Sequence, residues 1–142
     1  MIQIKNSRIY ITHCCAKKNN QLRVTGEKAT PDILYTATPT QRFMNTCKNK
    51  KVNWAIFSDK YGVWRYPVKH EWYEKNPNKV TNEEFKKLLE EFDKSLGSYK
   101  EISFYYNPGR FHRLYKRLIS KSKLKNRIRL FTHISEVNYG RE

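Results

Sequence analysis

The sequence lacks any apolar run of 18 or more residues, and its first residues do not form the apolar stretch of a secretory signal. Without either segment the chain is not expected to enter or cross a membrane, so we expect a cytoplasmic protein. Its 142 residues are the usual size of one folding unit and are enough to bury one core. We therefore expect a single domain over residues 1–142.

Cysteine is scarce, and the signature motifs of several enzyme classes are missing. Two of the three cysteines are adjacent and the third is remote, which matches neither a C-x-x-C pair nor a disulfide framework. The sequence has no G-x-x-x-x-G-K-[ST] loop, no G-x-G-x-x-G turn and no zinc deaminase signature. We therefore expect no metal and no cofactor, and we rank nucleotide hydrolysis, dinucleotide redox chemistry and zinc deamination low.

Acidic residues are also few. There are 13 Asp and Glu against 29 Lys and Arg, and the formal net charge of +16 favours a polyanionic partner. Residues 102–135 contain no acid at all. We expect this part of the chain to contact RNA or DNA, and the candidate residues are Arg110, Arg113, Lys116, Arg117, Lys121 and Lys123. The alternative is a solvated basic face in a lysine-rich proteome.

Strand-like and helix-like segments alternate along the chain. The predicted strands, rich in β-branched and aromatic residues, are 8–12, 52–57, 102–106 and 127–134. One helix is predicted from Thr30 onward, with a kink or break at Pro39. A second runs from a capping box at Thr81 to Gly97, and a third begins at Asn107, whose following proline suits a first helical turn.

Two segments without a period, 13–26 and 60–80, are predicted to be loops, and the longer one is expected to fold over the end of the sheet. Strands separated by helices of this length need crossover connections, which are right-handed. The sequence therefore predicts an α/β fold, a three-layer α/β/α sandwich with a mostly parallel sheet of about four strands.

Polar side chains follow the first two predicted strands, from His13 to Lys18 and from Ser58 to Gly62. Ligands of such sheets bind beyond the carboxyl ends of the strands. We expect Lys18 and Lys60 to converge on a phosphate or carboxylate, with Ser58 and backbone N–H groups around Gly62 completing the anion site. The alternative is that both lysines only reach solvent.

Further candidates surround these two turns. The rings that offer faces for stacking a base are Tyr61, Trp64, Trp72 and Tyr73. Glu74 can accept hydrogen bonds from a base or move a proton, and Cys14 is a nucleophile if nearby lysines lower the pKa of its thiol. The candidate catalytic residues are therefore Cys14, Lys60 and Glu74, with no reaction assigned. The alternatives are that the rings form a small core beneath the loop and that Cys14 fills buried space.

Four short motifs occur in the order found in a known family. They are Cys14-Cys15-x-x-Lys18, Leu34-Tyr35-Thr36, Trp54-x-Ile56-x-Ser58-x-Lys60-Tyr61-Gly62 and Tyr73-Glu74. In these motifs the chain resembles the DUF6884 family of small α/β proteins, which is similar to a domain of archaeosine-synthase-type tRNA modification enzymes. The resemblance implies a pocket for a nucleobase or nucleic acid and adds Tyr35 to it. Cys15, Asp59 and Glu74 depart from the family pattern, so the resemblance supplies no reaction.

Two functions remain open at this point. The first is an enzyme or enzyme-derived domain that recognises a nucleobase or nucleotide in nucleic-acid modification or repair. The second is a non-catalytic module that grips RNA or DNA through its basic C-terminal part. Both can hold together, because a basic helix can bind the polymer while a pocket takes one extruded base. The predicted pocket residues are Cys14, Lys18, Tyr35, Ser58, Lys60, Tyr61, Gly62, Tyr73 and Glu74. The sequence points to no particular protein partner.

Overall fold

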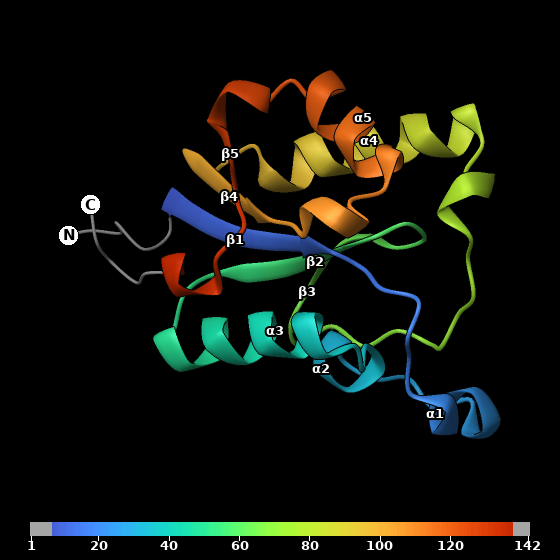
Figure 1. Ribbon diagram of the computed structural model, residues 1–142. Helices are drawn as coiled ribbons and strands as arrows, with labels where there is room; N and C mark the ends of the chain where they lie inside the picture. The colour runs from blue at the N-terminus through green and yellow to red at the C-terminus, as the bar shows by residue number, and fades with distance from the viewer. Residues whose placement is uncertain (1–6, 138–142) are drawn as a thin grey trace.

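The computed structural model describes residues 7–137, in which one five-stranded sheet lies between two layers of helices (Figure 1). The strands are β1 Arg8–His13, β2 Trp54–Ser58, β3 Gly62–Arg65, β4 Glu101–Tyr105 and β5 Ile128–Phe131. Their order is β3-β2-β1-β4-β5, and only the β2–β3 pair is antiparallel. The predicted α/β sandwich with a mostly parallel sheet is confirmed, with one strand more than expected.

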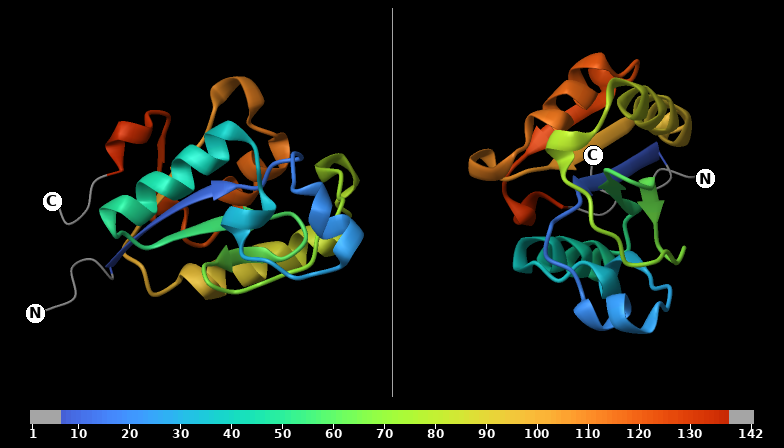
Figure 2. Two further views of the ribbon diagram at one scale, coloured as in Figure 1. Left: turned by 90° about the horizontal axis from the view of Figure 1, so that it is seen from below. Right: turned by 90° about the vertical axis from the view of Figure 1, so that its right-hand side faces the viewer.

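Helices cover both faces of the sheet. The α-helices are α1 Asn20–Thr25, α2 Pro31–Leu34, α3 Thr38–Lys50, α4 Asn82–Leu96 and α5 Arg113–Lys121. Single 3-10 turns are η2 Pro77–Lys79, η3 Pro108–Arg110, η4 Lys125–Arg127 and η5 Ile134–Glu136. Helices α4 and α5 lie on one face, and α2 and α3 lie on the other (Figures 1 and 2). Within residues 7–137, no helix combines the length and the apolar character needed to cross a bilayer.

The central strands are buried on both faces, which explains their nearly continuous apolar sequence. Helix α4 shows why the local sequence folds as it does. Its capping box is formed, since the Thr81 side chain accepts from the Glu84 amide and the Glu84 side chain accepts from the Thr81 amide. Phe85, Leu88 and Phe92 recur at helical spacing and are buried against the sheet.

A strand and an α-helix, besides the single turn η2, lie where loops were expected. The segment 60–80 begins with β3, which pairs with β2 and alternates buried and half-buried residues. It was missed because four residues are too few to show a period. Helix α1 lies within the expected loop 13–26 and buries only Leu22, so its sequence carries almost no apolar signal. Asn19 caps its first turn and Gly26 ends it in the left-handed conformation.

Two helix starts also differ from expectation. Asn107 caps only the single turn η3, and α5 begins at Arg113 with the His112 side chain accepting from the Leu114 amide. The expected helix from Thr30 is split, as Pro39 suggested: α2 is one turn, and Pro39 lies in the first turn of α3.

Gly62, at the start of β3, allows a test of how the hairpin is held. Its φ is +76°, and a Cβ there would lie 2.3 Å from Oε1 of Glu91, the atom that accepts from the Val63 amide. Gly26 has a similar φ of +74° but no atom within 4 Å of such a Cβ. We expect Gly26→Ala to lower the free energy of unfolding by about 1 kcal/mol and Gly62→Ala by about 2 to 4 kcal/mol. If urea titrations showed the same loss of unfolding free energy in both variants, Glu91 would move aside for the new Cβ without cost.

Candidate nucleotide site and basic surface

The carboxyl ends of β1 and β2 meet at one edge of the sheet, where Cys14 follows β1 and Asp59 follows β2. The two residues contact each other directly. The Cys14 thiol donates to Oδ1 of Asp59 at 3.5 Å, and the Asp59 amide donates to the Cys14 sulfur at 3.4 Å. We call the polar group gathered here the Asp59 cluster; its members are Cys14, Tyr35, Ser58, Asp59, Tyr73 and Tyr115.

Hydroxyl groups make up most of this cluster. Ser58 donates to the Tyr73 hydroxyl at 3.0 Å, and that hydroxyl pairs with the one of Tyr35 at 2.5 Å. The Tyr115 hydroxyl lies 3.2 Å from the Cys14 sulfur. Burial raises the pKa of all three tyrosines, with the nearby Cys14 adding to the effect. Every hydroxyl and thiol of the cluster is therefore protonated at neutral pH. Asp59 is the one group of the cluster that can act as a base.

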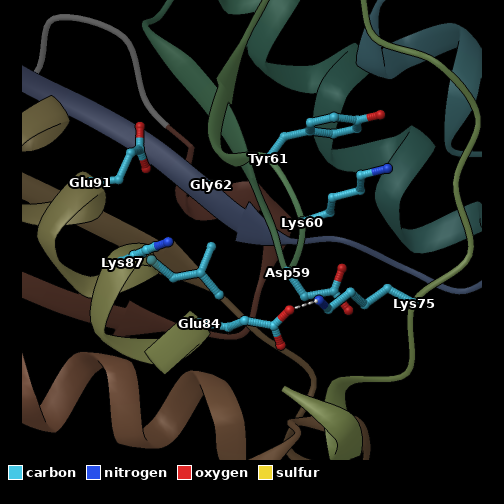
Figure 3. Close-up of a pocket in the computed structure, with 9 residues that line it drawn as sticks. Asp59, Lys60, Tyr61, Gly62, Lys75, Glu84, Lys87 and Glu91 are labelled. Carbon is cyan, nitrogen blue, oxygen red and sulfur yellow. Dashed lines mark hydrogen bonds and ion pairs between the residues drawn. The ribbon is translucent and has the colours of Figure 1, made fainter. Parts of the chain in front are cut away.

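Asp59 is a buried carboxylate, with 4% of its surface exposed. Burial raises its pKa, and the weaker opposing effects come from the Cys14 hydrogen bond and from the charges of Lys18 and Lys75. Within residues 7–137 no cation lies within 4 Å of it, because Lys75 pairs instead with Glu84 at 2.8 Å (Figure 3). A buried carboxylate without an ion pair is costly to the fold and is a common mark of a functional site.

Cys14 does not fit the role of nucleophile. Burial and then the charge of Asp59 raise the pKa of its thiol to about 12, opposite to the lowering by lysines that the sequence suggested. The thiol therefore stays protonated at neutral pH and donates to Asp59. The neighbouring His13 does not help, since its Nδ1 bonds to the Cys14 carbonyl at 2.9 Å rather than to the sulfur.

Lys18 and Lys60 come together at Tyr73. Their Nζ atoms lie 4.6 and 5.8 Å from the centroid of the same Tyr73 ring, within the span of one nucleotide. Lys60 is exposed, and it also lies over the ring of Tyr61 at 5.2 Å. Both ammonium groups therefore lie near the same ring beyond the strand ends, and their convergence on an anion remains a prediction.

Three residues that were predicted to line the pocket, Ser58, Tyr35 and Glu74, line neither hollow at Asp59. Ser58 is fully buried, and its hydroxyl accepts from the amides of Lys60 and Tyr61, so these amides hold the turn and do not face a ligand. Tyr35 is also fully buried and supports Tyr73 from behind. Glu74 is exposed and lines none of the pockets at the Asp59 cluster, because neighbouring side chains of an extended loop point in opposite directions.

The aromatic rings are less open to a base than their number suggested. Trp64 is buried in the core, and Tyr73 is 4% exposed. Tyr61 stacks on His70 with ring centroids 3.9 Å apart, so one of its faces is covered. Arg23 lies over the ring of Trp72 at 5.3 Å. These rings mainly form the small core under the loop, which is the alternative noted above.

Two hollows are lined by members of the Asp59 cluster, and a third lies beside α5. The larger of the first two measures about 350 Å³ and is lined by Asp59, Lys60, Lys75 and Lys87 among others (Figure 3). A pocket of about 90 Å³ on the other side of Asp59 includes Lys18 and Pro77. Pro77 also lines a third, of about 360 Å³, which includes Arg113 and Arg117 of α5. The first two hollows share Asp59 and Lys75, and the hollow beside α5 adjoins the second at Pro77.

The predicted nucleic-acid residues all lie on the surface. Those exposed on or next to α5 are Arg110, Arg113, Lys116, Arg117, Lys121 and Lys123. In the part of the chain that the structure describes, none of their side chains pairs with a carboxylate. The guanidinium of Arg117 packs over the Phe85 ring at 4.0 Å, which holds one charge in place beside α4. Their role in binding nucleic acid remains a prediction.

Sequence reasoning missed two residues that the structure places at the centre of the site, Asp59 and Lys75. Asp59 entered only as a departure from the motifs of the resembled family. Its signal was present, because a carboxylate directly after a strand buried on both faces lies at the edge where ligands bind. Lys75 carried no such signal, since its approach to Asp59 depends on the path of the loop between β3 and α4.

Comparison with known proteins adds no assignment: no family model, no curated protein and no solved structure matches the chain. Metal ligands do not gather either, since no three His, Cys, Asp or Glu side chains within residues 7–137 are grouped to hold an ion.

Proposed function

We propose that this protein recognises one nucleobase or nucleotide of a nucleic-acid strand at the Asp59 cluster and acts in nucleic-acid modification or repair. The observation that carries the proposal is a buried carboxylate without an ion pair that lines two hollows, one of which adjoins a hollow beside the cationic helix α5 at Pro77. A polyanion bound along α5 brings its bases past the hollow that Asp59 lines. The resemblance to the DUF6884 family, and through it to tRNA modification enzymes, points the same way.

Each part of the site has a defined task in this proposal. Asp59 accepts hydrogen bonds from the amino or imino groups of a base, or takes a proton from it. The charges of Lys18 and Lys75 act on this carboxylate, Lys60 lines the same hollow, and all three suit the phosphate groups on either side of the base. The buried hydroxyls of Tyr35 and Tyr73 hold the cluster in one geometry.

A second function is a non-catalytic basic module for RNA or DNA. The observation that favours it is the set of cations on α5 that form no salt bridge in the described residues. The two functions differ in what Asp59 contributes. A module that only grips phosphates needs no buried carboxylate, whereas recognition of a base depends on it.

Truncating Lys60 tests the proposed site. We expect Lys60→Ala to weaken ligand binding by about 1.5 to 3 kcal/mol, the usual loss for a hydrogen bond to a charged group, with little change in stability because the residue is exposed. The measurement is mass spectrometry of the nucleic acids and small molecules that co-purify with each variant. Lys79→Ala is the matched control, since Lys79 is exposed on η2 and lines none of the three hollows. Equal ligand content in both variants contradicts the site.

A further inference from the structure

A separate cavity of about 90 Å³ lies between the carboxyl ends of β1 and β4. From β1 the chain proceeds to β2 on one side, while β4 pairs on the other side, so this is the point where the order of the sheet reverses. Such a switch point is where open α/β sheets bind ligands. The cavity lining includes His13, Tyr105, Arg110 and Thr40, and it contains neither Asp59 nor any of the lysines around it.

The first turn of α3 faces this cavity without a cap. Ala37, the N-cap residue, has no side chain that can accept from the helix, and Pro39 brings no N–H of its own. Helices α1, α4 and α5 are each capped by a side chain, from Asn19, Thr81 and His112, whereas α3 and the one-turn α2 are not. The free amides and the positive end of the 13-residue helix dipole are therefore directed at the cavity.

The hydroxyl of Thr40 supplies an independent observation. Thr40 lines the cavity and is only 7% exposed, yet its hydroxyl has no hydrogen-bond partner in the described residues. In the same residues, only Arg65 Nε and Trp72 Nε1 are fully enclosed polar side-chain atoms without a partner. The Thr40 hydroxyl is therefore not sealed in the core but opens to the cavity. A nearly buried hydroxyl that faces an opening is ready to pair with a ligand.

Arg110 supplies the charge. Its side chain is exposed and lines the cavity, and no carboxylate of residues 7–137 pairs with it. No acidic side chain lines the cavity. His13 adds no charge at pH 7, because burial lowers its pKa. The site therefore combines hydrogen-bond donors and one guanidinium, the set of groups that binds phosphate in proteins.

We propose that this switch-point cavity binds a phosphate monoester, held by the first amides of α3, the Thr40 hydroxyl and the Arg110 guanidinium. Its volume of about 90 Å³ is room for a phosphate group. The rest of the ligand lies outside the cavity. This inference goes beyond the function proposed for the Asp59 cluster and does not rest on it.

The test is titration of the ¹⁵N-labelled protein with inorganic phosphate at constant ionic strength, followed by NMR. We expect saturable shifts of the Thr38 and Thr40 amide signals. Thr40→Val and Arg110→Gln should each weaken phosphate binding about tenfold or more. Thr40→Val removes an unpartnered hydroxyl from a nearly buried site and keeps the shape of the side chain, so the variant should fold with unchanged or higher stability.

Arg42→Gln is the matched control, because Arg42 is an exposed cation on the same helix that does not line the cavity. Phosphate affinity equal to wild type in Thr40→Val or Arg110→Gln, or an equal loss in Arg42→Gln, overturns the proposal. Short oligonucleotides with a 5′-phosphate or a 5′-hydroxyl then distinguish the source. A preference for the phosphorylated strand identifies a strand end, whereas equal binding of both, with retained affinity for ribose 5-phosphate, identifies a free phosphate monoester.

Discussion

Reversing the charges of Arg113, Lys116 and Arg117 together is expected to weaken nucleic-acid binding by about two to three orders of magnitude at low salt and to reduce its salt dependence. Each phosphate contact contributes a slope of about −0.7 to −0.9 to the plot of log affinity against log salt, because binding releases counterions. Three lost contacts should therefore flatten the slope by about 2 to 3. Fluorescence anisotropy with labelled RNA and DNA over a series of salt concentrations measures both quantities.

The structure makes this triple variant suitable. All three side chains are exposed on α5, and the buried residues on its other face, Leu114, Tyr115 and Leu118, are unchanged. The one packing contact that the variant loses is that of Arg117 with the Phe85 ring. A glutamate at position 113 even suits the positive end of the helix dipole. We expect the thermal unfolding midpoint to stay close to that of the unchanged protein.

A control with the same change in net charge separates contact from general attraction. Lys28, Arg42 and Lys69 are exposed cations outside α5 and form no salt bridge in the described residues. Reversing these three should lower the affinity only slightly and leave the slope nearly unchanged. An equal effect of the two triple variants would mean that the binding is spread over the whole surface, and unchanged affinity in the α5 variant would remove this helix from it.

The fold could be predicted because its signals are local. The capping box at Thr81 with apolar residues at helical spacing defines α4, and the apolar run before Ser58 defines a strand buried on both faces. Strands and helices that alternate along the chain are compatible with only a few sheet topologies. The strand β3 could not be predicted in this way, because its four residues are too few to show a period. The contact of Glu91 with the Val63 amide, which holds its start, joins residues far apart in sequence that no local pattern connects.

The site could be predicted only in part. The parallel pairing of β1 and β2 places the turns that carry Lys18 and Lys60 at the same edge of the sheet. Whether a polar side chain near these strand ends faces a ligand or the interior depends on the turn geometry. Ser58 turned inward to hold its own turn, and Glu74 turned outward to solvent. The importance of Asp59 depends on burial, which a single sequence does not report.

Replacing Asp59 by Asn is expected to stabilise the protein while it removes its function. The folded protein holds the Asp59 proton more tightly than the unfolded chain, since burial raises the pKa of this carboxyl group. Stability therefore falls as pH rises from the unfolded pKa of about 3.9 through the higher folded pKa, and ionised Asp59 destabilises the fold above that range. We expect Asp59→Asn to raise the free energy of unfolding at pH 7 by about 0.5 to 2 kcal/mol, with a smaller gain toward pH 4.

The same substitution should greatly weaken ligand retention or turnover. An amide keeps one acceptor for the Cys14 thiol but presents N–H groups where the carboxylate accepts hydrogen bonds, and it cannot take a proton. A positioned proton acceptor contributes about 10² to 10⁴ in rate, so a loss of about a hundredfold or more is expected if Asp59 performs that task. Urea titrations between pH 4 and pH 8, together with mass spectrometry of the bound ligand, measure the two effects in the same samples.

Asp93→Asn provides the contrasting control. The Asp93 carboxylate accepts from the Ser122 hydroxyl and the Lys123 amide and lines none of the hollows at the Asp59 cluster. It should lower stability and leave the ligand in place. If Asp59→Asn gains stability and loses the ligand, the Asp59 carboxylate serves function at the expense of stability. If Asp59→Asn instead destabilised the protein and kept its ligand, Asp59 would be a structural partner of Cys14, and the non-catalytic basic module would be the better account.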